Sequence, residues 1–123
     1  MDVADNKLAY ARQMGATHTV DAAREDAPAR IREITGRGAD YTVAVAGVAR
    51  ATEQAWASLA PGGTCVVVSA GTPEIRIPGG SLVMPERTLK GSCYGSARPR
   101  EDFLRLVNLY LAGILKIDEL ITK

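Results

Sequence analysis

The chain of 123 residues has few cysteine, histidine and aromatic side chains, with aromatic residues making up 5% of it. Its one histidine, His18, stands apart from any cluster of cysteines or carboxylates, and Cys65 and Cys93 have no partner at the spacing of metal ligands. Because a zinc site held by protein takes three or four ligands, the sequence predicts no metal site. Cys65 lies in an apolar run, so we expect it to be a buried core residue.

Charge and hydropathy exclude further classes of protein. The net charge is +1, and charges of both signs are mixed along the chain without a basic block, so nothing indicates a nucleic-acid-binding surface. No apolar run is long enough to cross a bilayer, and the residues after Met1 lack the basic start and apolar stretch of a signal peptide. We therefore expect a cytoplasmic protein whose partners include neither nucleic acid nor membrane.

Short apolar runs alternate with amphipathic stretches, a pattern typical of an α/β protein with a parallel sheet. We expect strands near residues 16–20, 39–47, 64–69 and 88–94, and helices near 7–14, 27–35, 51–59 and 99–112. Asp26 is a candidate N-cap for the second helix, and Gly36 is expected to end that helix. Because helical crossovers connect parallel strands, we expect a doubly wound sheet that is covered on both faces, in a single domain spanning residues 1–123.

The ends of the expected strands are small or acidic, which indicates a ligand site. In an open parallel α/β sheet, ligands bind at the carboxyl ends of the strands. These ends are Asp2, Asp21, Ala46-Gly47, Ser69-Ala70-Gly71 and Tyr94-Gly95. Asp2 is the most informative, because an acid at the end of the second strand of a dinucleotide-binding fold binds the ribose hydroxyls. A helix-forming run follows it directly.

Several stretches resemble the coenzyme domain of the zinc-type medium-chain alcohol dehydrogenases. They are Lys7–His18 with its Gly-Ala-Thr turn, Gly38–Tyr41 leading to Ala46-Gly47, Leu59–Thr64, Glu86–Gly95 and Asp118–Thr122. Together they run from one end of the chain to the other. The resemblance implies a partial Rossmann-like fold that lacks the first strand and its glycine-rich turn. It also implies NAD as cofactor and hydride transfer between nicotinamide and an alcohol or aldehyde.

The resemblance assigns cofactor-binding roles to individual residues. It places Asp2 and Lys7 at the adenosine ribose, where a carboxylate favours NAD because it repels the 2′-phosphate of the phosphorylated cofactor. The further cofactor-binding positions that it implies are Val45, Ala46, Gly47, Val68, Ser69, Ala70, Ser92 and Tyr94. It assigns no catalytic residue and no metal ligand to this chain.

Two parts that the family's chemistry needs are absent from the sequence. The zinc ligands of the family belong to a separate catalytic domain, and no Gly-x-Gly-x-x-Gly turn for the pyrophosphate occurs here. Hydride transfer to or from an alcohol needs both the metal and a cofactor fixed above it. We therefore expect a fragment of such an enzyme, inactive by itself, whose first strand lies upstream of Met1.

Two other functions remain open. One is a non-catalytic dimerisation module derived from such a domain, with Ile75-Arg76-Ile77 as its candidate edge strand. The other is an S-adenosylmethionine-binding domain, which also uses an acid after the second strand but needs an antiparallel last strand. Loss of the first strand would leave unpaired strand edges, so we expect a homo-oligomer through the edge around Ile75–Ile77. We expect Arg76 and Arg87 at the surface or at an interface.

Overall fold

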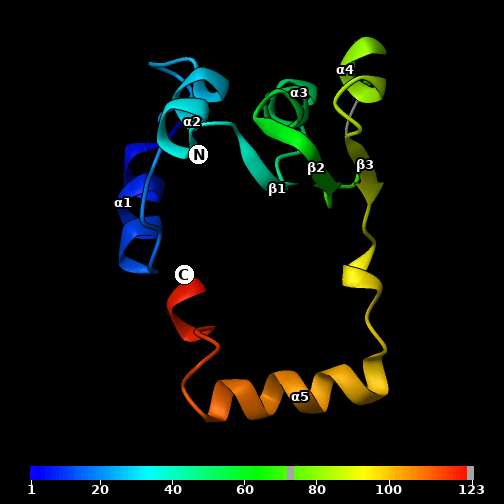
Figure 1. Ribbon diagram of the computed structural model, residues 1–123. Helices are drawn as coiled ribbons and strands as arrows, with labels where there is room; N and C mark the ends of the chain where they lie inside the picture. Colours follow the sequence, from blue (N-terminus) through cyan, green and yellow to red (C-terminus); the bar gives the residue numbers. More distant parts are fainter. Residues whose placement is uncertain (72–73, 122–123) are drawn as a thin grey trace. The chain divides into compact units, whose positions relative to one another are not determined.

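The computed structural model describes residues 1–71 and 74–121, so Thr122 of the last family-like stretch lies outside the described residues. The chain divides into two compact units, Met1–Ser92 and Cys93–Lys123. The first unit holds α1 (Asp5–Gln13), α2 (Ala27–Thr35), β1 (Ala39–Ala44), α3 (Ala49–Ala57), β2 (Leu59–Val67), α4 (Gly80–Val83) and β3 (Thr88–Gly91) (Figure 1). The second holds α5 (Pro99–Leu111) and 3₁₀ turns at Tyr94–Ser96 and Asp118–Leu120. No helix in the described ranges is long and apolar enough to cross a membrane.

Three parallel strands form the sheet of the first unit in the order β1-β2-β3, which confirms the α/β class and a partial Rossmann-like fold. The register shifts where β2 begins, because Ala39 pairs with Leu59 whereas Tyr41 pairs with Thr64. The turn residues 61–63 therefore lie inside β2 as an irregularity, whereas the sequence predicted a strand that begins only near residue 64. Helix α3 already ends at Ala57.

Two of the expected strands do not form, and the other three end earlier than predicted, β1 at Ala44 and β2 at Val67. In place of a strand at residues 16–20, one parallel bridge joins Asp2 to Asp21. Residues 74–77 have no strand structure, so the expected edge strand Ile75–Ile77 is wrong. Ile77 packs instead against the core cluster, because burying this side chain removes its apolar surface from water. β3 ends at Gly91 and not at Tyr94.

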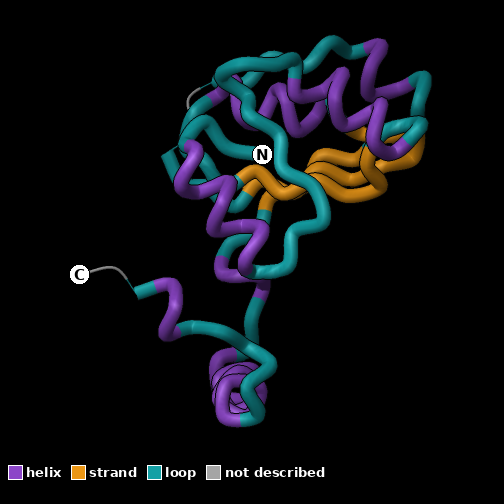
Figure 2. The backbone as a smooth tube through the Cα atoms, turned by 90° about the vertical axis from the view of Figure 1, so that its left-hand side faces the viewer, coloured by secondary structure: helices purple, strands orange, loops and turns teal. Residues whose placement is uncertain are grey.

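The core lies between the sheet and α3. Its buried residues are Ala44, Ala55, Trp56, Leu59 and Cys65, as predicted for Cys65. Figure 2 shows helical segments along one side of the strands. The other face carries Tyr41, Val43 and Val45, whose exposed fractions are 77%, 60% and 70%. The expectation of a sheet covered on both faces is therefore not met within Met1–Ser92.

Helix α2 has the ends that the sequence predicted. The Asp26 side chain accepts a hydrogen bond from the Ala29 N–H at 2.9 Å, which satisfies a donor that the first turn leaves without a helical partner. Gly36 ends the helix with a φ of +80°, in the left-handed region that glycine adopts without strain. The chain then enters β1 through Gly38, close to the start of β2.

Arg87 is half-buried and hydrogen-bonded within the first unit, whereas the sequence led us to expect it at the surface or at an interface. Its guanidinium donates to the carbonyls of Leu59 and Ala60, the latter at 3.3 Å, and lies 5.9 Å from the ring centroid of Trp56. Arg76, by contrast, has an exposed side chain, as expected. Arginine suits position 87 because its guanidinium carries several donors and can serve both carbonyls at once.

The second unit is built around α5. Its first turn contains Glu101 and Asp102, which favours the helix through the dipole, as predicted. The Tyr110 hydroxyl donates to Asp118 Oδ2 at 2.7 Å, and this hydrogen bond, together with the negative charge, raises the pKa of Tyr110 above its usual value. Helix α5 buries none of its residues.

Candidate functional site

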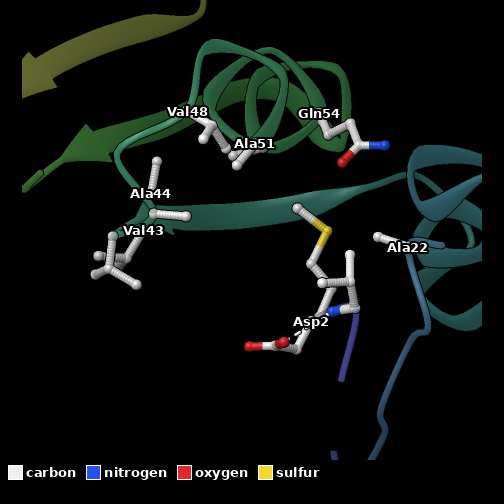
Figure 3. A pocket seen from close by; sticks show the side chains of 12 residues that line it. Asp2, Ala22, Val43, Ala44, Val48, Ala51 and Gln54 are labelled. Atoms are coloured by element: carbon white, nitrogen blue, oxygen red, sulfur yellow. Dashed lines mark hydrogen bonds between the residues drawn. The ribbon is translucent and has the colours of Figure 1, made fainter. Parts of the chain in front are cut away.

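A pocket of about 250 Å³ lies at the carboxyl end of β1 (Figure 3). Its walls come from the start of the chain, the segment after the Asp2–Asp21 bridge, the end of β1 and the helix α3. The lining residues are Met1, Asp2, Val3, Ala22, Val43, Ala44, Val45, Ala46, Val48, Ala51, Gln54 and Ala55. Asp2 and Gln54 bring the polar side chains, and the other lining residues are apolar. An apolar cavity with a few polar groups is typical of a small-molecule site.

The backbone around Asp2 is held by two hydrogen bonds to a neighbouring segment. The Asp2 N–H donates to the Val20 carbonyl at 3.2 Å, and the Ala22 N–H donates to the Asp2 carbonyl at 3.0 Å. The side chain is also oriented, because Oδ1 accepts from the N–H groups of Val3 at 2.8 Å and Ala4 at 3.1 Å. The second carboxylate oxygen, Oδ2, makes no hydrogen bond to the described residues, so it is available to a ligand.

An ion-pair cluster beside the pocket fixes the same segment. Arg24 lies 2.8 Å from Asp5 of α1 and 3.1 Å from Asp21, measured between nitrogen and oxygen atoms. The hydrogen bond to Asp5, then the charges of Asp5 and Asp21, raise the pKa of Arg24 above its usual value. Asp21 therefore links α1 to the bridge segment and is not among the residues that line the pocket.

The structure brings part of the predicted cofactor site together in the pocket. Asp2, Val45 and Ala46 all line it, although Asp2 is more than forty positions away from the other two in the sequence. Gly47 follows directly, and a Cβ atom at this position would lie 3.8 Å from the carbonyl oxygen of Ala70. The residues after β1 and β2 are therefore close neighbours.

Backbone hydrogen bonds align the ends of the three strands. The Val68 N–H donates to the Ala44 carbonyl at 3.0 Å, and the Ser92 N–H donates to the Val67 carbonyl at 2.9 Å. Val68, Ser92 and the residues between Ala44 and Gly47 thus share one edge of the sheet, and Ser69 comes directly after Val68. This is the edge at which parallel α/β sheets bind ligands.

Two predicted site residues are not among the residues that line the pocket. Lys7 is on α1 with an exposed side chain, and it is not among the pocket residues. Tyr94 belongs to the second unit, where it begins a 3₁₀ turn with a φ of +50° and is 92% exposed. The structure does not join these two residues to the pocket.

The sequence interpretation missed several lining residues, above all Gln54, Val48 and Ala22. Gln54 follows Ala51 by three positions, and residues at this spacing lie on the same side of a helix. The helical spacing that identified Ala51 and Ala55 as a packing face could therefore have placed Gln54 at its border. Ala22 reaches the pocket only through the Asp2–Asp21 bridge, which no local pattern predicts.

A zinc centre does not fit the described residues. Within residues 1–71 and 74–121, no three histidine, cysteine, aspartate or glutamate side chains gather as the ligands of a metal ion would. Cys65 is buried in the core, whereas Cys93 and His18 are exposed. We therefore derive no chemical step through zinc from this chain.

A parallel α/β sheet with an acid beside an apolar pocket at its carboxyl edge has the arrangement of Rossmann-like nucleotide-binding domains. Residues 1–112 match the family model described as zinc-binding dehydrogenase, and the chain belongs to this family. This membership confirms the resemblance found in the sequence, and it supports a nucleotide cofactor.

Curated relatives and solved structures agree with this family. The chain is 38% identical to an NDMA-dependent alcohol dehydrogenase from Amycolatopsis methanolica, over 95% of this chain and 33% of the relative. It is 39% identical to putative alcohol dehydrogenase D from Mycobacterium tuberculosis, over 94% of this chain and 33% of the relative. The crystal structure of benzyl alcohol dehydrogenase from Acinetobacter calcoaceticus matches with a TM-score of 0.94 and 28% identity, over 98% of this chain and 34% of that one. The chain thus spans about a third of the length of its relatives.

Proposed function

We propose that the chain is part of the coenzyme domain of an NAD-dependent, zinc-type alcohol dehydrogenase, and that its pocket binds the adenosine half of the cofactor. The observation that carries this proposal is the position of Asp2, whose carboxylate lines an apolar pocket at the carboxyl end of β1. Two vicinal ribose hydroxyls can donate to one carboxylate, whereas a 2′-phosphate is repelled by it. Asp2 therefore favours NAD.

The rest of the cofactor would follow the edge of the sheet. The pocket volume of about 250 Å³ suits one part of a dinucleotide and not the whole molecule. In this proposal the nicotinamide half passes the ends of β2 and β3, where Gly47 and Ala70 are small enough to let it approach the backbone. The family resemblance is the support for including Val68, Ser69, Ser92, Lys7 and Tyr94 in the cofactor site.

The proposed enzyme moves hydride between nicotinamide and an alcohol or aldehyde, and NAD supplies the hydride chemistry when it is bound. The described residues hold no cluster that could polarise an alcohol oxygen as a metal centre does. We therefore propose that the 123-residue chain binds cofactor but is inactive by itself. None of its residues is assigned as a proton donor or acceptor.

We further propose that the chain self-associates. The outer edge of β1 has no strand partner in the described part of the chain, and Tyr41 and Val43 beside it are exposed. Exposed apolar strand edges favour pairing with another chain. Because the segment Ile75–Ile77 forms no strand, the contact in this proposal moves from that segment to β1.

Calorimetric titration with NAD and NADP tests the cofactor proposal. We expect Asp2→Asn to weaken NAD binding about tenfold or more, since hydrogen bonds to a charged group contribute about 1.5–3 kcal/mol. Asparagine keeps an oxygen for the N–H groups of Val3 and Ala4, so the local backbone should be unchanged. Asp40→Asn is the matched control, because Asp40 carries an exposed carboxylate at the opposite end of β1.

The same titrations separate the alternatives. Equal NAD affinities of the two variants would contradict the role of Asp2. A chain that associates but binds no nucleotide would favour a non-catalytic assembly module. Binding of S-adenosylmethionine without binding of NAD would favour an S-adenosylmethionine-binding domain.

A further inference from the structure

We infer that Gln54 selects the base of the bound nucleotide by hydrogen-bonding the polar edge of adenine. This inference rests on the proposed function, in which the pocket at the end of β1 takes the adenosine half of a cofactor. It adds a residue that determines base specificity, whereas Asp2 serves the ribose.

The side chain of Gln54 has hydrogen-bonding capacity to offer a ligand. It is half-buried on α3 and lines the pocket together with Asp2. In Figure 3 its amide leaves the helix on the side of the segment that carries Ala22. Among residues 1–71 and 74–121, no side chain or backbone group forms a hydrogen bond with this amide. A half-buried amide without a protein partner gains most from a polar ligand.

The helix holds Gln54 in a fixed place. Its backbone carbonyl accepts from the Ser58 N–H at 3.0 Å and from the Ser58 hydroxyl at 2.7 Å. The neighbouring Ala55 and Trp56 are buried in the core against β1 and β2. The amide therefore projects from a packed element, and groups on rigid elements bind ligands more selectively than groups on loops.

The pocket between the two polar side chains suits a flat base. Its walls beside α3 are Ala51, Ala55 and Val48, which are short or branched apolar residues. The cavity of about 250 Å³ is smaller than the roughly 300–1,000 Å³ of pockets for drug-sized ligands, so one ring system and its sugar fill it. Small apolar walls leave room for a planar ring and offer it no hydrogen bonds along its faces.

The edge of adenine matches a side-chain amide. Adenine presents its 6-amino donor beside the N7 acceptor, and an Asn or Gln side chain can bind both at once. Hypoxanthine has a carbonyl oxygen in place of the amino group, so its edge at N7 presents two acceptors. One amide can satisfy the first pattern fully and the second only in part.

Calorimetric titration of the chain with AMP and with IMP, the hypoxanthine counterpart, tests this inference. We expect the unaltered chain to bind AMP about tenfold more tightly than IMP, as a bidentate contact provides. In Gln54→Leu we expect AMP binding to weaken about tenfold and the preference over IMP to disappear. Gln13→Leu is the matched control, because Gln13 is the other glutamine and is exposed at the end of α1.

The outcomes distinguish this inference from the function on which it rests. A preference for AMP that persists in Gln54→Leu overturns the inference alone, provided that Asp2→Asn still weakens AMP binding. An unaltered chain that binds neither nucleotide overturns both. If Gln54→Leu does not fold, the side-chain amide NMR signal of Gln54 in the unaltered chain decides: a shift on addition of AMP supports the contact, and no shift overturns it.

Discussion

At the scale of single residues, Gly38 permits the closest approach between two segments of the first unit. Its φ is +114°, and a Cβ atom built there would lie 2.6 Å from the backbone nitrogen of Ala60 and 2.8 Å from the carbonyl carbon of Leu59. Backbone atoms cannot move aside as the end of a flexible side chain can. The entry into β1 beside β2 therefore requires glycine at this position.

We predict that Gly38→Ala destabilises the fold by more than about 3 kcal/mol, because left-handed strain and the overlap with Ala60 add together. Gly36→Ala is the matched control. Its φ of +80° is also in the left-handed region, but a Cβ atom there meets no atom within 4 Å. We expect that control to lose only about 1–2 kcal/mol. Urea unfolding measures the free energy of unfolding of both variants. Equal losses would show that the contact between Gly38 and the backbone of Ala60 does not require glycine.

At the scale of elements, Arg87 joins three parts of the first unit. It follows α4, binds the two carbonyls at the start of β2, and lies over Trp56 of α3. The indole N–H of Trp56 in turn donates to Ser81 Oγ of α4 at 2.9 Å. The segment between β2 and β3 is therefore attached to α3 and β2 by polar contacts around one aromatic ring.

Replacing Arg87 by methionine should keep much of the packing but remove the donors and the charge. We predict a loss of about 1–3 kcal/mol in the free energy of unfolding, because two carbonyls lose a charged donor. Since Trp56 is the single tryptophan, its fluorescence should shift to the red as the region opens. Arg76→Met, at a residue whose side chain is 85% exposed, should stay within about 0.5 kcal/mol of the unaltered chain. A similar loss in both variants would contradict the joining role of Arg87.

At the scale of the whole molecule, the proposed self-association depends on the open edge of the sheet at β1. Tyr41 stands on β1 with 77% of its surface exposed, beside an unpaired strand edge in the described part of the chain. We predict that Tyr41→Glu shifts the protein from oligomer to monomer, because a charge on an edge strand opposes pairing. Size-exclusion chromatography with light scattering measures the mass.

The control for this prediction is Tyr94→Glu. Tyr94 is even more exposed, at 92%, but it lies outside the sheet, so its replacement should leave the mass unchanged. An unaltered chain that is a folded monomer at micromolar concentration would contradict the proposed association.

The sequence by itself determined the features that depend on neighbouring residues. Asp26 and Gly36 set the ends of α2, and Pro99 starts α5, because capping bonds and backbone dihedral preferences act within one turn. The apolar run around Cys65 also predicted a strand, because a short continuous apolar run is typical of a strand in a covered parallel sheet. Family-like stretches then assigned Asp2 to the cofactor site, and the structure places this residue in a pocket with Val45 and Ala46.

Only the tertiary structure decided how distant segments share their hydrogen bonds and apolar surface. Residues 61–63 lie inside β2 where its register with β1 shifts, and the Arg87 guanidinium binds two carbonyls at the start of β2 that are distant from it in the sequence. Gln54 and Asp2 line one pocket although they are distant in the sequence. The bridge between Asp2 and Asp21 holds Asp2 beside Ala22, which lines the same pocket as Gln54 of α3. Strand pairing and burial depend on which segments contact each other in space. A single stretch of sequence carries too little information to determine those contacts.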